Sequence, residues 1–91
     1  MSLEFEWNPL KAQKNLKKHG VSFIEAATVF SDSISMTYND PDHSYDEDRF
    51  FIIGLSSYGN LLIVSHAYRE DKIRIISARK LTRKERKQYE Q

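Results

Sequence analysis

Three apolar runs in the second half of the chain restrict its fold more than any other feature. They cover residues 49–55, 61–68 and 73–79 and are rich in the branched and aromatic side chains that favour strands. Between them, Ser56-Ser57-Tyr58-Gly59-Asn60 reads as a turn, and Glu70-Asp71 can make a two-residue hairpin turn. Apolar runs joined by such short turns predict an antiparallel meander that is buried on much of both faces.

The first half of the chain carries start and stop signals for two helices. Asn8-Pro9 fits a helix start, because asparagine caps free amides and proline at the first helical position loses no hydrogen bond. His19-Gly20 fits the end of that helix, since glycine accepts the left-handed conformation of a C-cap. Ser22-Phe23-Ile24-Glu25 matches a capping box and predicts a second, short helix that ends near Asp32.

Two further strands and a last helix complete the predicted order. Phe5 and Trp7 alternate with acidic residues, and residues 34–38 alternate apolar with small polar side chains, so both segments are expected to be strands. Thr82-Arg83-Lys84-Glu85 is a second capping box and opens a C-terminal helix. The prediction is an α+β fold of order β-α-α-β-β-β-β-α, with helices packed against one antiparallel sheet and a single domain over residues 1–91.

Composition excludes several classes of protein. The chain has no cysteine, which rules out disulfides and thiol chemistry and is compatible with a reducing cytoplasm. It has no apolar run of about 18 residues, so no membrane span is expected. Glu4 and Glu6 stand where a secretory signal needs a basic stretch. The three histidines lie far apart in sequence without a metal-ligand spacing, so neither a metal nor a cofactor is expected.

The net charge of +1 conceals a strong asymmetry along the chain. From residue 72 to the C-terminus there are eight basic and two acidic residues, whereas residues 38–48 hold five acidic residues and no lysine or arginine. A basic end of this kind fits a phosphate-binding surface. The alternative interpretation is a solvated helix face without a ligand.

Several strings of the sequence, taken together, resemble the BrnT family of bacterial toxins. No single string is specific, but they occur in order from about residue 5 to the C-terminus. They are Phe5-Glu6-Trp7-Asn8-Pro9, residues 15–23, Glu25-Ala26-Ala27, residues 29–32, Arg49-Phe50, residues 53–56, residues 74–79 and Thr82-Arg83-Lys84-Glu85. The resemblance implies a RelE-like fold and a ribonuclease that cuts RNA without a metal and inhibits translation. It also implies neutralisation by a BrnA-type antitoxin, assembly as a heterotetramer of two toxin–antitoxin pairs, and operator DNA binding through the antitoxin alone.

Metal-free cleavage of RNA makes clear demands on side chains. The 2′-hydroxyl must be deprotonated toward the neighbouring phosphorus, and charge that grows on the phosphoryl oxygens must be stabilised. Arginine suits the phosphoryl oxygens because its planar fork binds two of them, and histidine suits acid or base work because its pKa lies near neutrality. The catalytic candidates are therefore Arg79, which closes the third apolar run, Arg74 inside that run, and His66 inside the second.

Each catalytic candidate also has a purely structural interpretation. Arg79 could form an ion pair at a strand end, Arg74 must be paired or face water, and His66 could be a satisfied core residue. With a hairpin turn at residues 70–71, Arg79 falls opposite Leu62. Strand alternation then puts His66 and Arg79 on one face of the sheet and Arg74 on the other.

Further residues are candidates for binding RNA. Lys18 and His19 end the first helix, where they could hold a phosphate or only complement the helix dipole. Tyr68 could stack on an unpaired base or could pack in the protein. Glu47, just before Arg49, could act as a base or be a solvated loop side chain. The RNA-binding candidates are Lys18, His19, Arg49, Tyr68, Lys80 and Arg83.

Two other classes of function remain open. The chain could be a non-catalytic binding module whose sheet only holds a partner or a nucleic acid, or a DNA-gyrase poison of the same fold. A cleavage assay and a supercoiling assay separate these alternatives. The antitoxin is expected to cover the basic sheet face with an acidic or amphipathic segment, which would stabilise a protein with a small core.

Overall fold

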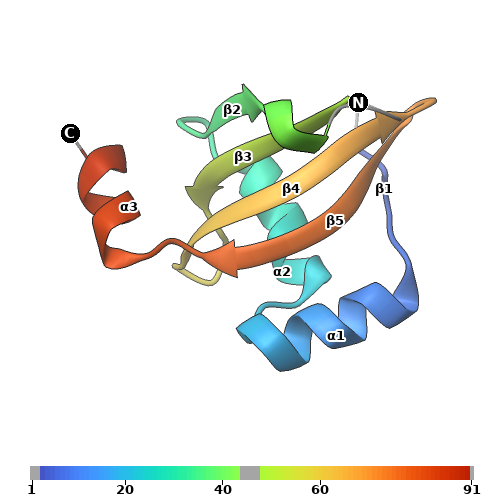
Figure 1. The fold of residues 1–91 in the computed structure, drawn as a ribbon, viewed down its shortest axis with the longest axis horizontal. Coiled ribbons are helices and arrows are strands. Elements are labelled where there is room, and N and C mark those ends of the chain that lie inside the picture. Colours follow the sequence, from blue (N-terminus) through green and yellow to red (C-terminus); the bar gives the residue numbers. More distant parts are fainter. Residues whose placement is uncertain (1–2, 44–47, 91) are drawn as a thin grey trace.

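A five-stranded sheet forms the body of the molecule, and helices α1 and α2 lie against one of its faces (Figure 1). The structure is a computed structural model that describes residues 3–43 and 48–90. The helices are α1 (Pro9–His19), α2 (Phe23–Thr28) and α3 (Arg83–Tyr89). The strands are β1 (Phe5–Glu6), β2 (Met36–Asn39), β3 (Arg49–Leu55), β4 (Leu61–Arg69) and β5 (Lys72–Lys80). Two short 3-10 helices, η1 (Val29–Ser31) and η2 (Pro41–His43), were not predicted from the sequence.

The sheet is mixed rather than purely antiparallel, which corrects the sequence prediction. Its strand order is β1-β5-β4-β3-β2, and β2 to β5 form the expected antiparallel meander. β1, however, pairs in parallel with β5, with Phe5 opposite Ile73. The chain crosses from β1 at one edge to β2 at the other through α1 and α2, and the meander then returns strand by strand. Its last strand therefore arrives beside β1, and there it runs in the same direction.

A β-bulge in the β4–β5 hairpin changes which side chains share a face. Near the turn the register is as predicted, with His66 opposite Ile75. Between Ser65 and His66 the register shifts by one residue, so Arg79 lies opposite Ile63 and not opposite Leu62. A shift of one residue exchanges the two faces for the rest of the strand. The prediction that His66 and Arg79 share a face is therefore wrong, and Arg74 and Arg79 lie together instead.

The core fills the space between the helices and one face of the sheet. The helical side contributes Val21, Phe23, Ala26 and Val29, and the sheet contributes Ile52, Leu62, Val64, Ile75 and Ala78. The opposite face carries no α1 or α2, and its side chains other than the buried Ala67 are half-buried to exposed, so the strands are not covered on both faces as expected. We call this second surface the open face.

The buried amide of Asn15 joins α1 to β5. Its Nδ2 donates to the carbonyl oxygens of Ala78 at 2.8 Å and Val21 at 2.9 Å, and its Oδ1 accepts from the Ala78 N–H at 3.1 Å. One helical side chain thus satisfies both backbone groups of a strand residue, as a neighbouring strand would. The residue held in this way directly precedes Arg79.

Only one of the two predicted capping boxes is complete among the described residues. In α3 the Thr82 Oγ1 accepts from the Glu85 N–H, and the Glu85 carboxylate accepts from the Thr82 N–H. In α2 the Ser22 hydroxyl accepts from the Glu25 N–H, as predicted. The buried Glu25 carboxylate, however, accepts from Ser56 Oγ at 2.7 Å and Asn60 Nδ2 at 2.8 Å in the turn after β3. Glu25 therefore fixes the β3–β4 turn to α2 instead of closing its own cap.

The helices are short. Within residues 3–43 and 48–90, none has the length and apolar character that crossing a membrane requires.

Candidate functional site

The open face combines arginines at its ends with aromatic and aliphatic side chains between them. Residues directly opposite one another on neighbouring strands point to the same face, so the register defines its members. β5 contributes Arg74, Ser77 and Arg79 beside Ile63 and Ser65 of β4. Further members are Phe51 and Ile53 of β3 and their partners Met36 and Tyr38 of β2. The surface therefore offers cationic and stacking groups side by side.

Arg79 presents its planar fork at one end of the open face and already holds an anionic group there. Its Nη1 donates to Glu85 Oε1 at 2.8 Å and its Nη2 donates to Glu85 Oε2 at 3.0 Å. This two-pronged pair raises the pKa of Arg79 and lowers the pKa of Glu85 from 4.5 to about 2. Both side chains keep about a third of their surface exposed, so solvent and ligands reach them. The ion pair that the sequence offered as a structural alternative is thus present.

Arg74 stands nearer the other end of β5 and is paired as well. Its Nη1 lies 3.3 Å from Glu6 Oε2 across the β1–β5 pairing, and both side chains are partly exposed. Arg49 of β3 and Arg74 both lie opposite Ala67 of β4, so the three share one row across the open face. Arg74 and Arg79 are separated by about 15 Å at the usual rise per strand residue. Cations therefore stand at both ends of an apolar stretch.

His66 faces the helical side and is completely buried. Its Nδ1 lies 3.2 Å from the Val64 carbonyl oxygen, which can only accept, so the proton belongs on Nδ1. The other ring nitrogen, Nε2, has no hydrogen-bond partner in the described part of the chain. Burial lowers the pKa of His66 and so favours the neutral ring.

Three aromatic rings enclose the imidazole of His66. Its ring centre lies 4.8 Å from that of Phe30, 5.5 Å from that of Tyr68 and 6.0 Å from that of Phe50. Tyr68 itself is more than half exposed, but it belongs to this helical-side cluster and not to the open face. The candidate for base stacking is therefore separated from both arginines by the thickness of the sheet.

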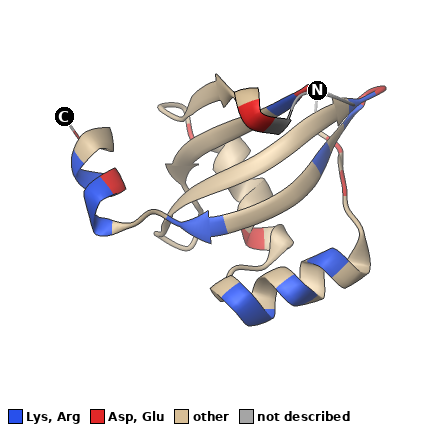
Figure 2. Ribbon diagram, in the orientation of Figure 1, with Lys and Arg blue, Asp and Glu red and all other residues tan. Residues whose placement is uncertain are grey.

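The remaining sequence candidates divide between the two sides of the molecule. Lys80 and Arg83 are exposed beside Arg79, at the end of β5 and the start of α3. Lys18 and His19 end α1 in the helical layer, where Lys18 is exposed and His19 is partly buried. Figure 2 shows the lysines and arginines as bands along α1, at the end of β5 and on α3. Glu47 lies outside the described residues.

Sequence reasoning missed the aromatic pair of the open face. Tyr38 of β2 lies directly opposite Phe51 of β3, and Tyr38 is 43% exposed. Alternation from Arg49 would have placed Phe51 on the same face as that arginine. The almost continuous apolar character of the run hid this signal.

Acidic and histidine side chains do not gather into a metal site in the described part of the chain. Over residues 3–43 and 48–90, no group of three such side chains lies close enough together to hold an ion.

Comparisons with known proteins agree on one family. A family model described as "Ribonuclease toxin, BrnT, of type II toxin-antitoxin system" matches residues 7–85. Among solved structures, the chain is similar to the crystal structure of the Brucella abortus ribonuclease toxin, BrnT. That similarity has a TM-score of 0.67 and 21% identity, and it covers 90% of this chain and 100% of the other. At this level of identity the likeness concerns the fold. No curated protein sequence is significantly similar to the chain.

Proposed function

Because this chain belongs to the BrnT family of ribonuclease toxins of type II toxin–antitoxin systems, we propose that it cleaves RNA on the open face of its sheet. The reaction needs no metal, takes place in the cytoplasm and inhibits translation. A BrnA-type antitoxin relieves the toxicity by binding the toxin in a heterotetramer and alone contacts operator DNA. The fold is of the RelE-like kind.

The geometry of Arg79 carries this proposal. Its guanidinium holds the Glu85 carboxylate through two hydrogen bonds of 2.8 and 3.0 Å at an exposed position. A phosphoryl group offers the same fork two oxygens and a negative charge. We assign Arg79 the role of binding the phosphoryl oxygens and stabilising the charge that grows on them. A phosphate that binds Nη1 and Nη2 of this fork displaces Glu85 in whole or in part.

Other groups of the open face would hold the strand. Arg74 and Arg49 supply a second cationic site about 15 Å from Arg79, at the usual rise per strand residue. Phe51 and Tyr38 stand on the same face and can stack on unpaired bases. Arg83, at the start of α3, extends the positive charge beside Arg79, whereas Lys80 lies opposite Leu62 and belongs to the helical side. Together these groups favour a single-stranded RNA over a duplex.

His66, Tyr68, Lys18 and His19 do not contribute to this arrangement. His66 faces the helical side, and a catalytic role would require Tyr68 or Phe50 to move away from its ring. Lys18 and His19 stand on α1, on the far side of the sheet. The proposed site therefore consists of open-face residues and the start of α3.

The deciding experiment is cleavage of a single-stranded RNA by the purified chain in the presence of EDTA. We expect cleavage of RNA but not of the DNA of the same sequence, because the nucleophile is the 2′-hydroxyl. Arg79→Ala should lower the rate about 100-fold or more, as removal of one charge-stabilising donor does elsewhere. Lys14→Ala, which removes an exposed cation of α1 on the far side of the sheet, is the matched control and should cleave at the wild-type rate.

A folded Arg79→Ala variant that cleaves as fast as the wild type would overturn the assignment of Arg79. RNA binding without cleavage by the wild-type chain would instead identify a binding module.

A further inference from the structure

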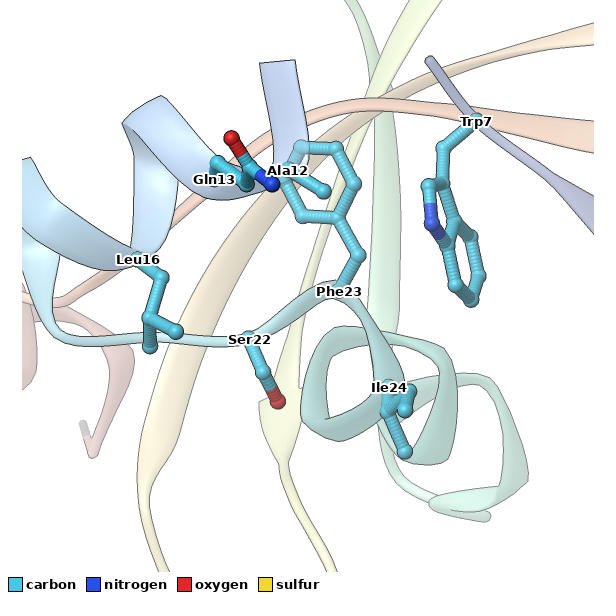
Figure 3. A pocket seen from close by; sticks show the side chains of 7 residues that line it. All are labelled: Trp7, Ala12, Gln13, Leu16, Ser22, Phe23 and Ile24. Carbon is cyan, nitrogen blue, oxygen red and sulfur yellow. The ribbon is translucent and has the colours of Figure 1, made fainter. Parts of the chain in front are cut away.

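A hollow in the helical layer lies on the side of the sheet away from Arg79. It opens between α1, α2 and the segment that follows β1, and Figure 3 shows its side chains. We call it the α1–α2 groove. Its lining residues include Trp7, Ala12, Gln13, Leu16, Phe23 and Ile24.

The groove has the size of one large apolar side chain. Its volume is about 170 Å³. A cavity of about 150 Å³ holds a benzene molecule, whereas small-molecule sites begin at about 300 Å³. Pockets that receive a single leucine or aromatic anchor are typical of the centre of protein–protein interfaces. The volume therefore fits an anchor residue of a protein better than a metabolite.

The rim of the groove is apolar and faces solvent. Leu16 of α1 is 51% exposed and Ile24 of α2 is 64% exposed, while Phe23 at the floor is buried. Trp7 stacks edge-on against Phe23, with ring centres 6.0 Å apart. Apolar side chains that gather around a hollow in this way mark an interaction site.

The charge beside the groove selects the kind of partner. α1 carries Lys11, Lys14, Lys17 and Lys18 and no acidic residue, as its bands in Figure 2 show. Lys17 stands one turn beyond Gln13 and so extends the same flank of the helix. A second copy of this chain would bring like charges together, which is costly at an interface. The apolar lining offers nothing to a phosphate backbone. An acidic segment with one apolar stripe complements both the lysines of α1 and the apolar lining of the groove.

We propose that the α1–α2 groove is the docking site of an acidic amphipathic segment of the antitoxin. The segment inserts one apolar side chain between Leu16 and Ile24 and directs its carboxylates toward the lysines of α1, in the manner of a helix in a groove. The proposal rests on the proposed function only in taking its partner from the toxin–antitoxin pairing of the family. It anchors the antitoxin on the helical layer, whereas the charge pattern of the sequence pointed to the sheet face.

The test uses the full toxin chain and the co-encoded antitoxin. Any tryptophan of the antitoxin is replaced by phenylalanine, and the toxin keeps Trp7. Trp7 is the one tryptophan of the toxin and lines the groove, so its fluorescence reports occupancy directly. We expect a shift of Trp7 emission when the antitoxin binds. Leu16→Asp and, separately, Lys17→Glu should weaken binding about tenfold or more, the loss typical of an anchor residue.

Leu10→Asp is the matched control. Leu10 lies on the same helix and is 68% exposed, but it does not line the groove. This variant should bind the antitoxin as the wild type does. If Leu16→Asp and Lys17→Glu both bind with the wild-type affinity, the groove is not the docking site. A Trp7 shift caused by a single-stranded RNA, or by raising the concentration of the chain alone, would assign the groove to a nucleic acid or to a second copy and overturn the proposal.

RNA cleavage by the same variants separates the two proposals. The groove variants should cleave RNA at the wild-type rate because they leave the open face unchanged. Loss of antitoxin binding with cleavage retained supports the groove. Absence of cleavage by every variant and by the wild type removes the proposed function, and the binding data still decide the groove.

Discussion

Glu85 has two opposite effects on Arg79: it orients the guanidinium, and it competes with a phosphate for the same hydrogen-bond donors. The carboxylate keeps the guanidinium in a defined orientation, but it occupies both hydrogen-bonding positions that a phosphate would use. An ion pair that is about a third exposed contributes little to stability. Its main effect is therefore on ligand binding.

Glu85→Gln should strengthen RNA binding, because the neutral amide competes less well for the fork of Arg79. We expect an affinity several-fold higher in a filter-binding titration, with Glu90→Gln, at the C-cap of the same helix, as the control. Weaker RNA binding by a folded Glu85→Gln variant would show that Glu85 positions Arg79 rather than competing with the ligand.

The same ion pair makes the free energy of unfolding depend on the protonation of Glu85 at low pH. Since its pKa falls from 4.5 to about 2 on folding, its contribution to the free energy of unfolding is complete above pH 4.5 and is lost as the pH falls toward 2. Over that interval the wild type should lose slightly more stability than Glu85→Gln does, because the exposed ion pair contributes little. Urea unfolding at both ends of the interval measures the difference, and equal losses would contradict the lowered pKa.

His66 makes the stability of the protein depend on pH in a range closer to neutrality. Burial lowers its pKa in the folded state, so the unfolded chain binds more protons once the pH drops below 6.5. Stability is therefore fully present above that value and declines beneath it. His66→Phe should fold, because three aromatic rings surround the site, and should lose less stability between about pH 7.5 and 5.5. Urea midpoints at the two pH values test this. A variant as acid-sensitive as the wild type would assign the effect to other groups.

At the scale of elements, local signals predicted where helices and strands begin, whereas distant partners decided the details. Thr82-Arg83-Lys84-Glu85 and Ser22-Phe23-Ile24-Glu25 carry equivalent capping signals, yet only the first forms both bonds of the box. Glu25 is drawn to Ser56 and Asn60, which lie more than 30 residues away in the chain. A sequence pattern four residues long contains no information about such partners.

The bulge in β5 limited the prediction of the site in the same way. Ile75 and Ile76 are adjacent and both apolar, so the two-residue alternation breaks there without showing which one is the extra residue. The turn at residues 70–71 fixed the register of its immediate neighbours correctly. Beyond the bulge every assignment of a face was reversed, and for that reason Arg79 was placed with His66.

The contact between α1 and β5 depends on one amide. Asn15→Leu would leave the Ala78 N–H and C=O and the Val21 C=O without their side-chain partner in a buried place. We expect the free energy of unfolding to fall by about 1–3 kcal/mol, the cost of unsatisfied buried groups. Chemical denaturation measures it, with the exposed Gln13→Leu on the same helix as the control. A loss no larger than that of the control would show that water replaces the amide.

For the whole molecule, the sequence predicted the class of fold and the succession of apolar runs better than it predicted how the two sides are used. Charge counts placed the positive charge in the C-terminal part of the chain, but α1, on the opposite side of the sheet, carries four lysines as well. The two sides differ in character: arginines with aromatic rings on the open face, and lysines beside an apolar hollow on the helical layer. We propose that the open face binds RNA and that the helical layer binds the antitoxin.

Asn15 gives these two sides a mechanical connection. Because its amide is hydrogen-bonded to the backbone of Ala78, next to Arg79, we expect a displacement of α1 to be transmitted to this arginine. Thermodynamic reciprocity then applies: if a ligand on α1 lowers the affinity for RNA by some factor, bound RNA lowers the affinity for that ligand by the same factor.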